Sequence, residues 1–139
     1  MTEHVETNWV DDMVFESSVE GFTVKMDAEE QNGGKHQGPR PKLLLLGALA
    51  GCTGMDVISI LKKKRQEVTG LEIRVKGKKA EDYPKKFTDI TLEFIVKGKD
   101  ISEEAVKKAI ELSMNKYCSV KATLEGAAKI GFSYKIIQE

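Results

Sequence analysis

A long apolar segment in the middle of the chain, LLLLGALAGCTGMDVISI over residues 43–60, most constrains the fold. It holds one charged residue, Asp56, and four basic residues follow at 62–65. A helix drawn through it is apolar on nearly every face, so it must be buried all round or cross a membrane. Asp56 would be costly inside a bilayer, and no second segment could pair with it there. We therefore predict a central helix over residues 41–66 that is covered by protein, with three glycines that admit close packing: Gly47, Gly51 and Gly54.

The remainder of the chain predicts mostly strands. Residues 4–28 hold three short, partly alternating stretches with turn signals between them, which predict a three-stranded sheet, and residues 29–41 predict a surface loop. Residues 70–139 predict two alternating strands, a helix capped by Ser102 and a final strand. The order β-β-β-α-β-β-α-β predicts one α+β domain over residues 1–139, with antiparallel sheets around the central helix.

Charge and composition narrow the class of partner. The 139 residues carry equal numbers of basic and acidic side chains, so the net charge is zero, and only 6% are aromatic. Neither nucleic acid nor an anionic membrane is expected to bind a chain of this kind. The N-terminus lacks the basic and apolar regions of a signal peptide, and we therefore expect a cytoplasmic protein.

Two cysteines, Cys52 and Cys118, carry the candidate chemistry. In a reducing cytoplasm such thiols are inert core residues, metal ligands or redox groups. His4 and His36 do not give zinc-binding spacing with them, so no metal is expected. Cys118 follows a predicted helix end, where the dipole opposes a thiolate. Cys52 lies inside a helix, and Asp56, one turn away, is expected to be a buried, hydrogen-bonded carboxylate.

Two segments of the sequence resemble a known family. The stretch GPRPKLLLLGALAGCTGMDVISILKKKR, residues 38–65, resembles the first-cysteine helix of the OsmC/Ohr family of thiol peroxidases. The stretch AIELSMNKYCSVKATL, residues 109–124, resembles the segment that carries the second cysteine of the family. The order of elements is also similar over nearly the whole chain, and the central motif is closer to the less characterised OsmC-like branch.

The resemblance implies an intertwined homodimer with two long helices at its centre, sheets outside and active sites at the dimer interface. It implies that Cys52 reduces an organic hydroperoxide and becomes a sulfenic acid, which Cys118 resolves to a disulfide. A dithiol reductant, which in Ohr members is a lipoyl group on a carrier protein, would reopen the disulfide. The implied role is antioxidant stress defence, and no cofactor is involved.

The sequence departs from the peroxidase pattern at two positions. Peroxidases of the family carry an Arg in the N-terminal sheet and a Glu ten residues before the first cysteine. Here Lys42 stands ten residues before Cys52, and no Arg precedes Arg40, so Lys25, Arg40 or Lys42 are the candidates to supply positive charge. Two alternatives therefore stay open. One is a non-catalytic binding protein with a small molecule beside Cys52, and the other is an interaction module with an unreactive thiol.

Overall fold

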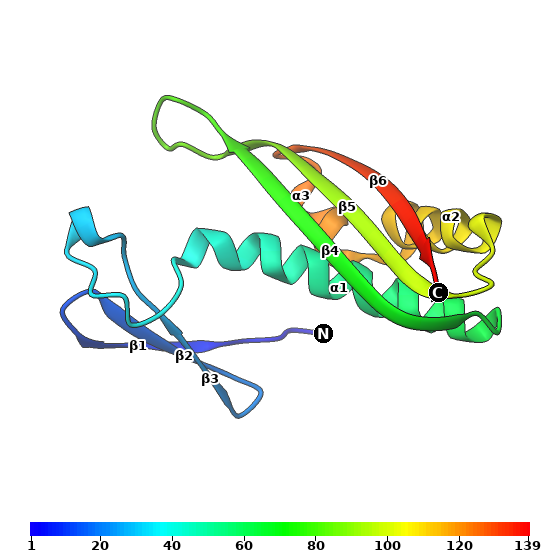
Figure 1. Cartoon of the computed structure of the whole chain (residues 1–139). Coiled ribbons are helices and arrows are strands. Elements are labelled where there is room, and N and C mark those ends of the chain that lie inside the picture. The colour runs from blue at the N-terminus through cyan, green and yellow to red at the C-terminus, as the bar shows by residue number, and fades with distance from the viewer. The chain divides into compact units, whose positions relative to one another are not determined.

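Two three-stranded sheets, one long helix and several shorter helical segments make up the chain in the computed structural model, which describes residues 1–139 (Figure 1). The α+β class is as predicted. The chain divides into two compact units, Met1–Leu45 and Leu46–Glu139. Each unit is described below by itself, and the single domain over residues 1–139 stays a prediction.

The first unit contains the predicted N-terminal sheet. Strands β1 (Glu6–Asp11), β2 (Val14–Val19) and β3 (Phe22–Met26) pair antiparallel in sequence order. The predicted loop follows, with a short 3₁₀ turn over Glu30–Asn32. The buried Asp27 closes this loop, because its carboxylate accepts the N–H groups of residues 28, 35 and 37 at 2.7, 3.0 and 3.1 Å.

The second unit contains a mixed sheet, ordered β4 (Glu67–Lys79), β5 (Phe87–Lys99) and β6 (Lys129–Gln138). Strands β4 and β5 form the predicted antiparallel hairpin, but β6 runs parallel to β5. The prediction that both sheets are antiparallel is therefore wrong for β6. A helical connection separates β5 from β6 in the chain, and such a crossover returns the next strand in the same direction as the last.

The helices begin where the sequence predicts, but one ends early and one is new. Helix α1 spans Pro41–Lys63 rather than residues 41–66, because Arg65 adopts a left-handed conformation with φ of 57°. The N–H groups of Arg65 and Gln66 then bond to the carbonyls of residues 62 and 61, both at 3.0 Å, in a Schellman cap. Helix α2 (Glu103–Leu112) is capped by Ser102 as predicted. A π-helical turn, η2 (Ser113–Tyr117), and a short helix, α3 (Ser119–Leu124), follow it unpredicted.

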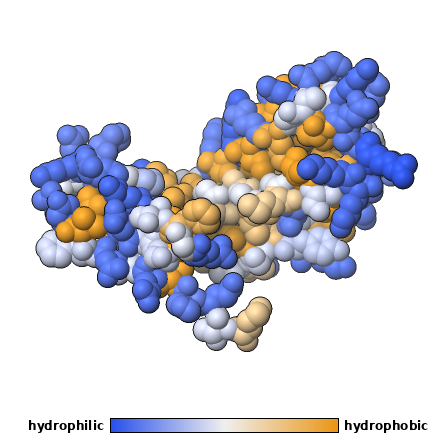
Figure 2. Space-filling view, turned by 90° about the horizontal axis from the view of Figure 1, so that it is seen from below, coloured by the Kyte–Doolittle hydropathy of each residue, from blue (hydrophilic) through white to orange (hydrophobic).

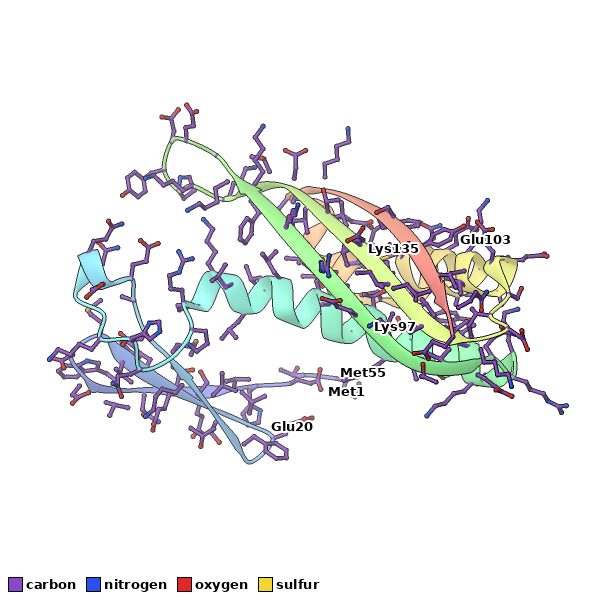
Figure 3. The ribbon with its side chains drawn as sticks, in the orientation of Figure 1. Met1, Glu20, Met55, Lys97, Glu103 and Lys135 are labelled. Atoms are coloured by element: carbon purple, nitrogen blue, oxygen red, sulfur yellow. The ribbon has the colours of Figure 1, made fainter.

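The core of the second unit lies between the sheet and the helices. Alternate side chains of β5, as predicted, turn inward and are buried: Ile90, Leu92, Phe94 and Val96. They form one cluster with apolar residues of α1 and α2. The outer face of the sheet carries charged residues, among them Lys97 and Lys135 (Figure 3). One covered and one charged face explain the alternating pattern of the strands.

Helix α1 is covered along only one stripe within the chain. Its buried residues recur every fourth position: Leu49, Thr53, Val57 and Leu61. Of its other apolar side chains, Leu46 and Ile60 are partly buried against the core, whereas Met55 is 76% exposed. Seen from below, hydrophobic residues form part of the molecular surface (Figure 2). By length and composition α1 would also suffice to cross a membrane. The prediction of a helix covered on all sides is therefore not met by a single chain.

The three glycines of α1 also differ in how closely other residues of the chain pack against them. A Cβ added at Gly54 would lie 3.1 Å from Ile73 Cδ1 of β4, so this glycine does admit close packing. A Cβ at Gly47 or Gly51 would meet nothing within 4 Å. Only Gly54 therefore has a packing role inside the chain.

We expect Phe94→Ala to lower the free energy of unfolding by about 3–5 kcal/mol, because the substitution leaves a cavity in a core that β5, α1 and α2 share. Chemical denaturation followed by circular dichroism measures this loss. Tyr83→Ala, at a side chain that is 86% exposed, is the control and should change stability by less than about 0.5 kcal/mol. Equal losses in the two variants would contradict the assigned core.

Candidate active site

The two cysteines occupy different local structures. Cys52 lies on α1 beside the buried Thr53 and is itself half-buried. Cys118 is 3% exposed and lies between the π-turn and α3. Its Sγ accepts the N–H of Lys121 at 3.4 Å, so Cys118 is the N-cap of α3. The expectation that Cys118 only follows a helix end is thus incomplete, because a second helix starts at it.

The fold brings these two predicted residues together. Hydrogen bonding to the Cys118 thiol is one of the causes that lower the pKa of Cys52, so the two thiols are close to each other. The Ser119 hydroxyl lies 3.8 Å from Cys52 Sγ, and the N–H groups of Ser119 and Val120 also act on it. Cys52 therefore faces the first turn of α3, which begins immediately after Cys118.

Hydrogen bonding gives the two thiols different acidity. Burial raises the pKa of Cys52, but hydrogen bonds from the Val120 N–H, the Cys118 thiol, and the hydroxyl and N–H of Ser119 outweigh burial and leave that pKa below its usual value. Burial, the hydrogen bond with Cys52, and the charges of Cys52 and Asp56 raise the pKa of Cys118 to about 11, against the Lys121 N–H, which lowers it. Cys52 is therefore the more acidic of the two thiols, and Cys118 is the less acidic one.

No side-chain cation is among the principal causes of the low pKa of Cys52. Lys25 forms an ion pair with Glu16 at 3.8 Å, and Arg40 forms one with Glu29. The donors that stabilise the thiolate are instead peptide N–H, hydroxyl and thiol groups. Sequence reasoning missed Ser119 and Val120, because it placed no helix start after Cys118; the short polar stretch Cys118-Ser119 was the available signal.

A chain of polar side chains lies behind the thiols. The hydroxyls of Thr53 and Ser113 are 2.7 Å apart, and both residues are fully buried. Ser113 Oγ in turn donates to Asp56 Oδ2 at 2.8 Å. Asp56 is thus a hydrogen-bonded carboxylate, as the sequence predicts, but it is half-buried rather than buried. Nowhere in residues 1–139 do three or more His, Cys, Asp or Glu side chains converge as metal ligands would, and His4 and His36 belong to no such group.

Both a protein family and a bacterial protein are similar to this chain in sequence. A model of the family described as "OsmC-like protein" matches residues 33–133, which include both cysteines. Protein YhfA of Escherichia coli K12 is 40% identical over 130 residues, which cover 93% of this chain and 94% of YhfA.

Two solved structures have the same fold. A protein of Aquifex aeolicus superposes with a TM-score of 0.89 at 32% identity, over 100% of this chain and 98% of that one. The organic hydroperoxide resistance protein OhrB of Bacillus subtilis superposes with a TM-score of 0.65 at 18% identity, over 97% and 98% of the two chains.

We expect an alkylating reagent to modify Cys52 alone in the folded, reduced protein at neutral pH. Its rate should rise with pH and level off below the pH of about 8.5 that is typical of a free thiol, because the thiolate form is stabilised. Cys118 should react only near pH 11 or after unfolding. Mass analysis of the modified peptides against pH measures both profiles.

The matched variants Ser119→Ala and Ser119→Thr test the cause of this difference. Loss of the hydroxyl in Ser119→Ala should move the Cys52 profile to higher pH, and Ser119→Thr, which keeps a hydroxyl, should stay near wild type. Faster reaction of Cys118 than of Cys52 at neutral pH would contradict the assignment.

Proposed function

The chain belongs to the OsmC-like protein family, and on that premise we propose that it is a thiol-dependent peroxidase that reduces organic hydroperoxides in the cytoplasm, as part of antioxidant defence. The observation that carries the proposal is the proximity of Cys52 to the segment that begins at Cys118, together with a lowered pKa of Cys52 and a pKa of Cys118 raised to about 11. The fold of an organic hydroperoxide resistance protein is in accord with it.

In the first step the Cys52 thiolate attacks the peroxide. Its sulfur bonds to one oxygen of R–O–O–H, and the O–O bond breaks. The alkoxide RO⁻ takes a proton from solvent and leaves as an alcohol, while Cys52 becomes a sulfenic acid, Cys–SOH. A low pKa favours this step because the thiolate is the nucleophile.

In the second step Cys118 resolves the sulfenic acid. Its sulfur attacks Cys52 Sγ, a disulfide forms, and the departing hydroxide leaves as water with the proton that Cys118 carried. The influence of each thiol on the pKa of the other supports a position of Cys118 close to Cys52 before reaction. A dithiol reductant, such as a lipoyl group on a carrier protein, then reopens the disulfide by two exchange reactions and becomes a disulfide itself.

We also propose that the protein works as a homodimer. Apolar residues of α1 outside the buried stripe, Leu43, Leu45 and Met55 among them, are 40, 45 and 76% exposed. So much open apolar surface on one helix is typical of a contact with another chain. A second copy of α1 would complete the cover that the sequence predicts.

Met55→Glu is expected to give a monomer in sedimentation velocity, because a carboxylate would be buried without a partner at the contact between two copies. Thr91→Glu adds the same charge at an exposed position of β5 and should leave a dimer. A wild-type protein that sediments as a monomer at micromolar concentration would contradict the dimer.

Treatment with an organic hydroperoxide is expected to yield an intramolecular Cys52–Cys118 disulfide. Cys52→Ser should abolish peroxide consumption, at least a hundredfold below wild type, because the nucleophile is gone. Cys118→Ser should stop after one turnover with a sulfenic acid on Cys52 that dimedone traps. Mass spectrometry under non-reducing conditions identifies each product.

Two free thiols after peroxide treatment of the wild type would refute the peroxidase. In that case the non-catalytic alternative gains support, provided that an apolar small molecule binds wild type and Cys52→Ser with the same affinity.

A further inference from the structure

The segment that carries Cys118 has an uncommon backbone conformation. Residues Ser113–Tyr117 form a π-helical turn between α2 and α3. The turn is closed by the Cys118 N–H, which donates to the Ser113 carbonyl at 2.8 Å. Isolated π-turns are rare and are often found at functional sites. The extra residue in the turn changes the direction in which the next side chain, that of Cys118, leaves the backbone.

Ser113 attaches this turn to α1 through its side chain. A hydroxyl group has one proton, and Ser113 gives that proton to the Asp56 carboxylate. In the contact of 2.7 Å with Thr53, Ser113 is then the acceptor and Thr53 the donor. The Thr53 hydroxyl also lies 3.6 Å from Met114 Sδ, a weak acceptor that shares the same proton. The bonds therefore run in one direction, from Thr53 through Ser113 to Asp56.

These bonds connect the two thiols by a short path. Thr53 is the next residue after Cys52 on α1, and Asp56 is one turn further along. Ser113 receives the Cys118 N–H on its carbonyl and binds both α1 residues with its hydroxyl. Ser113 therefore holds the backbone N–H of Cys118 in place relative to α1, the helix that carries Cys52.

We propose that Ser113, held by Thr53 and Asp56, is a positioning residue that keeps Cys118 against Cys52 for disulfide formation. The inference rests on the proposed function, since it assigns a part in the resolving step. A disulfide needs its two Cα atoms within about 7 Å and a defined torsion, so a shift of the π-turn would reduce the rate and extent of closure. Ser113 is fully buried, so its bonds do not compete with water.

The test uses the full-length protein in glutathione redox buffers at pH 7, without peroxide. Oxidised glutathione and the two thiols exchange to give the Cys52–Cys118 disulfide and two reduced glutathione molecules. The fraction oxidised at equilibrium, measured by mass spectrometry, gives the effective concentration of one thiol at the other. A variant that only lowers the stability of the folded state, with the thiols placed as in the wild type, would lose thermal stability without a change in the effective concentration.

Ser113→Ala is expected to lower the effective concentration at least tenfold. Asp56→Ala, at a half-buried residue where folding is less at risk, should lower it severalfold, and Asp56→Asn, which keeps an acceptor oxygen for Ser113, should restore most of the loss. Ser133→Ala, an exposed serine of β6, is the control and should match wild type.

Wild-type values in Ser113→Ala and Asp56→Ala, with both variants folded by circular dichroism, would overturn the positioning role. If Ser113→Ala does not fold, Asp56→Ala against Asp56→Asn decides alone. No disulfide in the wild type at any buffer ratio also overturns it. This outcome is separable from the proposed peroxidase activity. The glutathione buffer forms the disulfide even if peroxide does not, so the positioning role can be tested without peroxidase activity. Conversely, peroxide turnover can persist in a variant whose effective concentration is unchanged.

Discussion

The packing of one stripe of α1 against the sheet and α2 is the interaction on which the other features depend. Leu49, Thr53, Val57 and Leu61 form that stripe, and its one polar member, Thr53, immediately follows Cys52. The neighbour of a fully buried helical residue lies at the margin of the core. Cys52 is therefore half-buried: desolvated enough to have fixed partners, yet accessible to a small molecule.

The acidity of Cys52 comes from the backbone of a neighbouring segment. Two of its four donors are peptide N–H groups, of Ser119 and Val120, and these donors do not depend on which side chains occupy the positions. These backbone donors explain what can stabilise the thiolate in a chain that has Lys42 where the resemblance implies Glu and that has no Arg in β1–β3. Charge-assisted bonds from a few oriented donors can stabilise a thiolate without a cation.

The sequence correctly predicted those features that depend on short-range patterns of residues. The inward residues of β5, the start of α1 at Pro41 and the Ser102 cap all follow from alternation or local hydrogen-bonding chemistry. The direction of β6 does not follow from alternation, because parallel and antiparallel strands can show the same alternation, and the predicted helix between β5 and β6 was the available signal. The end of α1 was missed since Arg65, rather than Gly, takes the left-handed position. Of the site, the two cysteines were candidates from the sequence itself and took their roles from the resemblance, whereas Ser113, Ser119 and Val120 reach α1 only through tertiary packing.

The hydrogen bonds to Cys52 also influence the thermodynamics of recycling. They favour the anionic, reduced sulfur and lose most of their strength once that sulfur is in a neutral disulfide. Stabilising the reduced form raises the reduction potential of a cysteine pair, by about 30 mV for each 1.4 kcal/mol. In the proposed cycle, the first turn of α3 would therefore make the disulfide form a stronger oxidant, and a modestly reducing dithiol would suffice to regenerate the thiols.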